Sequence, residues 1–311
     1  MQTIDALVVE IEQAGPDITP SQAARLGRAK ELLRQIEAET TRLAQAAGQV
    51  IPAAQSQAIQ QALQRAESLT VAQAPDAQAA AELARQWTGL NRGALENLVG
   101  ALSDGSPLDD WLRQLAPDAV QAARDVLTDG VARGINPRDL ARELTRATGM
   151  PLNRAMSVSR TETMRSFTQA SLTAMQENGD IVTMYERSAA MSPRTCAACI
   201  ALSGKRYPLT VPFDEHPQGR CSPIPVLDDP DGLLPEIETG EQWFARQPAD
   251  VQRQILGIGG YDAYRRGEIQ LQDMVAHDSS EKWGGSNRRA TLSEARAAAK
   301  RRRSGERTAA D

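Results

Sequence analysis

Residues 196–221 read Cys-Ala-Ala-Cys-Ile-Ala-Leu-Ser-Gly-Lys-Arg-Tyr-Pro-Leu-Thr-Val-Pro-Phe-Asp-Glu-His-Pro-Gln-Gly-Arg-Cys. This stretch contains all three cysteines and one of the two histidines of a 311-residue chain. Two residues separate Cys196 from Cys199, a spacing that lets a tight turn direct both sulfurs to one point, and His216 and Cys221 follow in a second loop. The pattern predicts one zinc ion held by these four side chains.

A zinc ion with four protein ligands has no open position for water or substrate, so the predicted site is structural. Such a site supplies roughly 10–16 kcal/mol of apparent binding free energy, enough to fold a segment with few apolar residues. A reduced or redox-active Cys-x-x-Cys pair is the alternative that the residues leave open. A zinc deaminase is not indicated, because its His-x-Glu motif is missing. An HNH-type nuclease needs a second histidine as base, and His277 lies far along the chain in a polar loop.

The sequence around the cysteines has the period of strands. Strands are predicted over 181–185 and 224–227, with a hairpin turn near 204–207. Five prolines between positions 208 and 225 exclude long regular ladders. Residues 179–230 are therefore predicted to form a small β module that the metal holds together.

Helices are predicted again over 231–297. Breaks are expected at Pro248 and at 257–260, and a polar loop at 277–287. Thr291 and Glu294 have the spacing of a capping box, which predicts the start of a last helix.

Upstream of the module, residues 80–178 are predicted to be helical. One short helix is expected to begin at Pro137 and to end near Ala147, and the next to cover 152–177, with Gly149 and Pro151 between them. Periodicity places Arg160 in the centre of an apolar face of that second helix, where a buried guanidinium needs an acceptor. Glu162 lies about 200° away around the helix and is not an obvious partner.

Two interpretations of Arg160 and Glu162 stay open. In the first, Arg160 is structural and ties its helix to the zinc module. In the second, the pair belongs to an anion or substrate site.

The N-terminal residues 1–75 are predicted to form a helical arm or hairpin. Apolar or small residues recur every three or four positions over 26–50, as in a heptad seam. Pro52 is expected to end this helix, and 59–69 to return as a second one. Either the two helices pack as an antiparallel hairpin, or the seam is offered to a partner protein or another copy. Residues 71–80 are expected to be a linker.

The predicted class is therefore mainly α with a small β zinc-binding module (α+β) and a helical N-terminal arm. The formal net charge of −5 argues against a surface that binds nucleic acid throughout. One local exception is the basic tail 298–311, which contains Lys300, Arg301, Arg302 and Arg303. These cations either complement the dipole of the last helix or contact an anionic partner such as DNA. No signal peptide or membrane span is indicated, and cysteines confined to one cluster suit a reducing compartment.

Taken together, several stretches resemble the phage Mu F-like minor head protein family, also called phage head morphogenesis proteins. The resemblance covers roughly 115–295. It rests on R-T-E-T-M-R at 160–165, R-T-C-A-A-C-I-A-L-S-G-K at 194–205, H-P-Q-G-R-C-S-P-I-P-V at 216–226, and E-Q-W-F with the following Q-R-Q-I-L-G and Y-R-R-G-E-I-Q-L within 241–271. Many members have a further cysteine two residues before the last one, where this chain has Gly219. This departure argues against a larger metal cluster.

The resemblance implies a non-enzymatic component of the virion head that acts in capsid assembly at the portal vertex, with DNA packaging or ejection as further roles. Its implied partners are the portal protein, capsid or scaffolding proteins and packaged double-stranded DNA, with no membrane in the virion. The implied locations are the host cytoplasm during assembly and then the virion head. No toxin or enzyme domain is expected after the module.

Two other functions are weighed against this one. The first is a DNA-processing or transferase enzyme that uses the helix of Arg160 and Glu162 together with the zinc module. The second is a zinc-dependent DNA-binding regulator, which would need a basic recognition helix next to the metal. Only three cations lie within 196–221, which is too few for such a helix.

Overall fold

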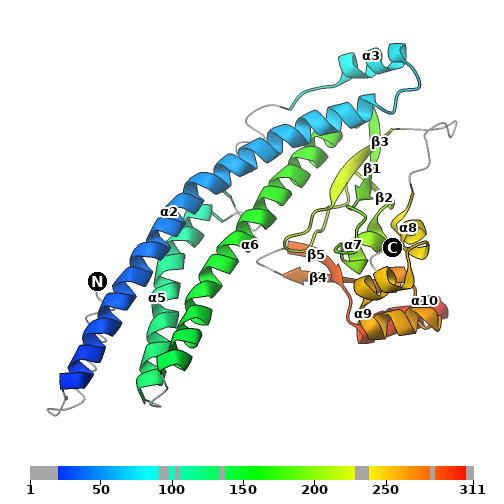
Figure 1. The fold of residues 1–311 in the computed structure, drawn as a ribbon. Helices are drawn as coiled ribbons and strands as arrows, with labels where there is room; N and C mark the ends of the chain where they lie inside the picture. The colour runs from blue at the N-terminus through cyan, green and yellow to red at the C-terminus, as the bar shows by residue number, and fades with distance from the viewer. Residues whose placement is uncertain are drawn as a thin grey trace. The chain divides into compact units, whose positions relative to one another are not determined.

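The computed structural model describes residues 20–90, 98–101, 106–132, 137–227, 238–280 and 284–305. Within these residues the chain is mostly helical with two small antiparallel sheets, which agrees with the predicted α+β class (Figure 1). The chain forms two compact units, and both α2 (Pro20–Val71) and α6 (Pro137–Glu177) contribute to each of them. Unit 1 comprises Met1–Pro52 and Ser106–Ser159, and unit 2 comprises Ala53–Gly105 and Arg160–Asp311.

Unit 1 is helical where it is described, apart from Ser106 and Pro107. It contains the first part of α2, the helix α5 (Leu108–Ala132) and the first part of α6. Leu112 lies 3.4 Å from the position that a Cβ on Gly48 would take, so α2 and α5 are closely packed. The buried apolar residues of this unit are Leu33, Ile51, Leu108, Leu112, Leu115, Ala119, Val120, Ala123 and Val158.

The predicted break at Pro52 is wrong, because α2 continues through this residue to Val71. An interior proline removes one backbone hydrogen bond and costs about 3 kcal/mol. Ile51 and Ile59, on either side of Pro52, are both buried, and their packing outweighs that cost. The predicted return helix is therefore the second half of α2, and no antiparallel hairpin forms within residues 20–71.

The predicted break at Gly149 and Pro151 is also wrong, because α6 runs without interruption from Pro137 to Glu177. Its predicted first residue, Pro137, and its end before Asn178 are confirmed. The predicted N-cap Asn136 lies outside the described residues.

A three-stranded sheet in unit 2 carries the cysteine-rich stretch. Its strands are β1 (Val182–Ser188), β2 (Arg206–Pro208) and β3 (Ser222–Leu227), in the antiparallel order β2-β1-β3. Tyr185 at the centre lies opposite Tyr207 and Pro225, and its ring stacks on that of Tyr207 with centroids 5.4 Å apart. The strands predicted at 181–185 and 224–227 are thus confirmed.

The predicted linker 71–80 contains the start of a helix. Helix α3 (Ala77–Gln86) begins inside the expected linker 71–80, and its N-cap Asp76 accepts hydrogen bonds from the backbone N–H groups of Gln78 and Ala79. Aspartate is a favoured N-cap, and its carboxylate explains why α3 starts here.

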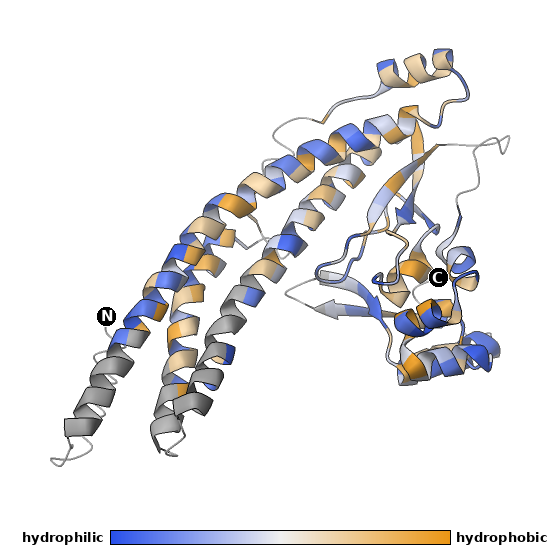
Figure 2. Cartoon of the chain, viewed as in Figure 1, coloured by the Kyte–Doolittle hydropathy of each residue, from blue (hydrophilic) through white to orange (hydrophobic). Residues whose placement is uncertain are grey.

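The C-terminal helices pack around a short buried helix. They are α8 (Gly240–Ala245), α9 (Ala249–Arg265), the 3₁₀ helix η1 (Leu271–Met274) and α10 (Leu292–Ser304), and they share a core with α7 (Ala197–Leu202). All six residues of α7 are buried, and Figure 2 shows that this helix is hydrophobic whereas the end of α10 is hydrophilic. None of the helices in the described part of the chain combines the length and the apolar character that crossing a bilayer requires.

The local sequence signals in this region predicted a helix start and a helix break correctly, and one predicted loop is wrong. The capping box of Thr291 and Glu294 is confirmed, and the expected break near 257–260 is a kink at Gly257, whose φ is 72°. The predicted polar loop at 277–287 is wrong, because β4 (Val275–Ser280) and β5 (Gly284–Arg289) pair there. These strands lack apolar alternation and are held by pairing and by ion pairs of Arg288, which periodicity does not detect.

The close contact of α8 with α7 predicts that a methyl group added at Gly240 strongly destabilises the fold. A Cβ on Gly240 would lie 1.7 Å from the carbonyl oxygen of Ile200, and the Gly240 N–H already donates to the Ser203 carbonyl at 3.0 Å. We expect Gly240→Ala to lower the free energy of unfolding by about 1–3 kcal/mol or more, because the two helices must separate. Urea denaturation measures this, with Gly89→Ala as the control, since no atom lies within 4 Å of its added Cβ. Equal stability of the two variants would contradict the close approach.

Candidate metal centre

Helix α7 positions the two cysteines of the Cys-x-x-Cys pair. Cys196 is the N-cap of α7, and its sulfur accepts a hydrogen bond from the backbone N–H of Cys199 at 3.3 Å. Residues three apart lie on the same face of a helical turn, which brings the two sulfurs to 3.1 Å from each other. Cys199 is only 6% exposed. The predicted geometry of this pair is therefore present.

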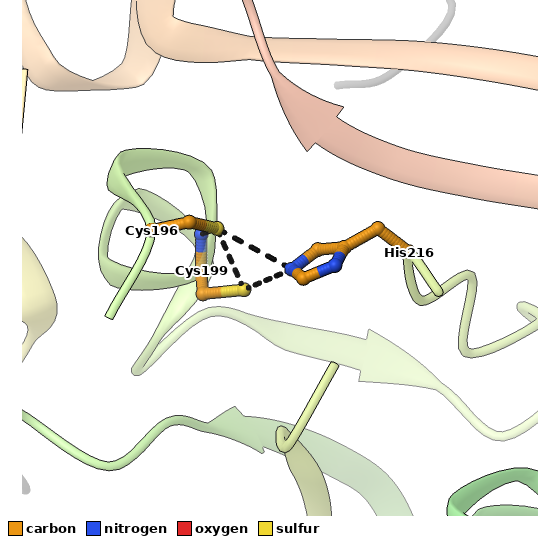
Figure 3. A group of neighbouring side chains, drawn as sticks. All are labelled: Cys196, Cys199 and His216. Carbon is orange, nitrogen blue, oxygen red and sulfur yellow. Dashed lines mark hydrogen bonds between the residues drawn. The ribbon is translucent and has the colours of Figure 1, made fainter. Parts of the chain in front are cut away.

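His216 reaches the same point from the loop that precedes β3. Its Nε2 lies 3.4 Å from the sulfur of Cys196 and 3.2 Å from that of Cys199 (Figure 3). Its Nδ1 lies 2.9 Å from the carbonyl oxygen of Pro217, which favours the tautomer with the proton on Nδ1 and leaves Nε2 as the ligand atom. The donor atoms of Cys196, Cys199 and His216 all lie within 4.8 Å of one another, and we call them the first triad.

A second triad shares Cys199 with the first. The donor atoms of Cys199, Glu215 and Cys221 also lie within 4.8 Å of one another, and a Glu215 carboxylate oxygen is 3.7 Å from the Cys199 sulfur. The four predicted ligands thus approach each other as parts of two groups instead of one. Glu215 was not predicted as a ligand. Its place next to His216 in the sequence is the one signal that could have indicated it.

Proton affinities in the cluster reflect the short contacts. The hydrogen bond with Cys199 lowers the pKa of Cys196 to about 4, and the hydrogen bond with Cys196 raises the pKa of His216 to about 9. Hydrogen bonds with Cys196 and Cys221, together with burial, raise the pKa of Cys199. Metal ligands must be deprotonated, so a cation bound here would displace protons from His216 and Cys199.

Arg187 on β1 holds the Glu215 carboxylate. Its guanidinium donates to a Glu215 carboxylate oxygen and to the Asp214 backbone carbonyl, both at 3.1 Å, and lies 3.9 Å above the centre of the Phe213 ring. The Arg187 and Glu215 side chains are 3% and 11% exposed, so this is a buried ion pair. The sheet therefore fixes the orientation of a carboxylate at the metal centre.

Gly219 makes room for that carboxylate. A Cβ at position 219 would lie 2.2–2.3 Å from three side-chain atoms of Glu215, which real Cβ atoms do not tolerate. The Glu215 side chain therefore occupies the space that a side chain at position 219 would need. Gly285 on β5 accommodates the Asp214 carboxylate in the same way, at 2.6 Å.

A groove of about 590 Å³ borders the cluster within unit 2. Most of its lining comes from the C-terminal half of α6 and the loop 209–219, and Leu98, Ala101, Cys221 and Gly285 complete it. Three of the five candidate donors, Glu215, His216 and Cys221, line it. The cluster is therefore reached from this side.

The structure corrects the prediction for Arg160. This residue is exposed, as is Met156, whereas Glu162 is 2% exposed and lies 4.0 Å from Arg165. The buried face of α6 is built partly from small polar residues that periodicity does not count, such as Ser166, which donates to the carbonyl of Leu98. Glu162 lines the groove and Arg160 does not.

The second histidine also has a different environment from the predicted polar loop. His277 lies on β4, and its Nδ1 is 3.7 Å from an Asp214 carboxylate oxygen and 3.2 Å from the Asn287 side-chain oxygen. It belongs to neither triad. The antiparallel pairing of β4 with β5 brings it to the loop that carries His216, which its distance along the chain did not indicate.

The basic residues of the tail belong largely to α10. Arg302 makes two hydrogen bonds with the Asp273 carboxylate, at 3.0 and 2.9 Å, and Arg303 donates to the backbone carbonyls of Gly267 and Glu268. Lys300 and Arg301 are exposed. Two of the four predicted nucleic-acid contacts therefore already serve the fold.

Thiolate, imidazole and carboxylate donors together suit a transition-metal ion such as zinc and do not suit magnesium or calcium. The cluster can hold a metal ion.

A comparison with known proteins agrees with the resemblance. A family model described as Phage Mu protein F like protein matches residues 121–225. This range includes all five candidate donors and Arg187, whereas the motifs at 241–271 lie outside it. No curated protein and no solved structure matches the chain. The predicted resemblance is thus confirmed over 121–225.

Proposed function

We propose that this chain, whose residues 121–225 match the phage Mu F-like family, is a non-enzymatic minor head protein of a tailed phage or prophage. It acts in capsid assembly at the portal vertex, with packaging or ejection of the DNA as the steps it serves. Its partners are the portal protein and capsid or scaffolding proteins, first in the host cytoplasm and then in the virion head. The observation that carries this proposal is the family match over residues 121–225. This range contains all the candidate metal ligands.

The metal we propose is zinc in a structural role. Cys196 caps α7 and Cys199 lies within it, whereas His216 and Cys221 lie in the loop before β3, so one ion would connect two separate segments of the chain. This loop forms a wall of the groove. Bound zinc would therefore keep that wall in place for a partner.

The alternative is a DNA-processing or transferase enzyme that uses the helix of Arg160 and Glu162 together with the zinc module. One observation favours this enzyme: Glu162, Asp214 and His216 all line the groove. Arg160, the proposed anion-binding group, is exposed and is not part of that lining. The structure therefore offers this particular catalytic pair less support than the sequence did.

Affinity purification from prophage-induced cells tests the proposed role. A tagged full-length chain should co-purify with the portal protein, and the same purification from uninduced cells is the control. Recovery of the chain without any head protein, at a stage when heads are being assembled, would contradict the proposal. Deletion of residues 1–70 is not a clean test, because Ile59, Ala62 and Ala66 belong to the core of unit 2.

The basic end of α10 predicts a weak, salt-dependent contact with DNA. If Lys300 and Arg301 each neutralise one phosphate, the logarithm of the binding constant should fall with the logarithm of the salt concentration with a slope of about −1.8, at about −0.9 per contact. Four contacts would give a slope of about −3.6. A salt titration of DNA binding measures this slope. The double variant Lys300→Ala with Arg301→Ala should abolish this salt dependence. The double variant Arg34→Ala with Arg42→Ala, which removes two exposed arginines of α2, should leave it unchanged. Equal slopes for both double variants would place the contact elsewhere.

A further inference from the structure

The charge and position of Glu215 indicate that this residue does more than lie next to the cluster. We propose that Glu215 is a direct ligand of the metal, which gives a five-donor site with Cys196, Cys199, His216 and Cys221. The inference rests on the metal centre proposed above and changes its ligand set. It also names Arg187 as the residue that positions the fifth ligand.

Distances support a shared ion. Ligands bonded to one zinc ion at about 2.0–2.3 Å lie about 3–4 Å from each other. One Glu215 carboxylate oxygen, Oε1, is 3.7 Å from the Cys199 sulfur and 3.4 Å from the His216 Nε2. Both separations are those expected for ligands of the same ion.

Glu215 also connects the two triads. Cys221 is grouped with Cys199 and Glu215, whereas His216 and Cys196 are grouped with Cys199 alone. Glu215 is close to members of both groups, because it contacts Cys199 and His216 and belongs to the triad of Cys221. A single ion between the triads would therefore have the Glu215 oxygen among its nearest neighbours.

The two carboxylate oxygens have different partners. Oε2 accepts from Arg187, while Oε1 accepts from the His216 backbone N–H at 3.2 Å and faces the sulfur of Cys199. This arrangement leaves Oε1 to bind as a monodentate ligand. Three thiolates and one carboxylate carry a formal charge of −4, which zinc reduces to −2 and the guanidinium of Arg187 to −1. Arg187 thus offsets the charge that a fourth anionic ligand adds.

Gly219 is the second residue on which this ligand depends. Any side chain at position 219 would overlap Glu215, as the 2.2 Å approach to Oε1 shows. We therefore expect Gly219→Ala to displace Glu215 from the metal without removing a donor atom.

Zinc X-ray absorption of the unaltered full-length chain is the direct test. The spectrum should fit three sulfur and two nitrogen or oxygen ligands at about one zinc per chain. Three sulfur ligands with one nitrogen would overturn the role of Glu215 and leave the proposed four-ligand site intact. Protein that folds but binds no zinc would overturn the metal centre itself, so the two failures are distinguishable.

Cobalt substitution gives the matched comparison of variants. Four-coordinate Co²⁺ absorbs visible light more strongly than five-coordinate Co²⁺. Glu215→Ala and Gly219→Ala should therefore increase the d–d absorbance and weaken zinc binding by about tenfold or more, whereas Asp214→Asn, which removes a neighbouring carboxylate outside both triads, should do neither. Because Glu215→Ala leaves Arg187 buried without its carboxylate, the double variant Arg187→Met with Glu215→Leu removes both charges and the oxygen donor together and should give the same spectral change. An unchanged cobalt spectrum in the folded double variant would overturn the proposal.

Discussion

Cys199→Ser should remove the metal and the order of the sheet together. Cys199 is the only donor shared by the two triads of the described residues, so its loss breaks both groups at once. A structural zinc site contributes roughly 10–16 kcal/mol, which is as large as the whole stability of a typical domain. Metal analysis should fall from about one zinc per chain to none. Hydrogen exchange should show lost protection in β1, β2 and β3.

Cys196 and the C-terminal helices provide the controls. Cys196→Ser leaves the second triad of Cys199, Glu215 and Cys221 in place, so some zinc binding should remain. The core formed by Phe244, Leu256 and Met274 with their neighbours is separate from that of Cys199 and Cys221, and protection of α9 and α10 should persist longer than that of the sheet. Chelation of the unaltered protein should reproduce the effects of Cys199→Ser. Folded, zinc-free protein with a protected sheet would show that the metal is not structural.

Arg187→Ala should be the most destabilising substitution of a charged residue in the sheet. Removal of one partner from a buried ion pair costs about 3–5 kcal/mol, because the remaining charge is left buried. Here Glu215 would lose Arg187, and the ring of Phe213 would lose the cation above it. We therefore expect the free energy of unfolding to fall by about 3–5 kcal/mol, measured by urea denaturation of the zinc-loaded protein.

Arg246→Ala is the matched control for this substitution. Arg246 pairs with Glu238 at 2.6 Å, but both side chains are largely exposed, and such pairs contribute about 0–1 kcal/mol. If the free energy of unfolding falls equally in the two arginine variants, the buried ion pair of Arg187 does not contribute more stability than the exposed one.

Local sequence signals predicted several element ends correctly. The capping box at Thr291, the first residue of α6 at Pro137 and the turn after Glu177 each depend on a few neighbouring residues. The same holds for the approach of Cys196 to Cys199, because a two-residue gap within one turn is enough to bring their sulfurs together. The family resemblance, too, was readable from contiguous motifs, and the match over 121–225 confirms it.

Long-range packing decided the features that were predicted wrongly. The apolar residues around Pro52 keep α2 continuous although proline is the strongest helix breaker, since burial on both sides exceeds the local cost. In α6, small polar residues that make hydrogen bonds occupy the buried face, which turned Arg160 outward and Glu162 inward. Strands β4 and β5 pair into a sheet although their sequences have no apolar alternation that would predict strands.

By itself, the sequence determined the helical class, the β module, the candidate cysteine and histidine donors and the family resemblance, because each is written in neighbouring residues or in a fixed spacing. Only the tertiary structure placed Glu215 beside those candidate donors. Its role depends on Arg187 from β1, which lies 28 positions away, and on the missing side chain at Gly219. A carboxylate is a ligand only where an opposite charge and free space direct it to the metal, and both come from folding, which places distant residues side by side.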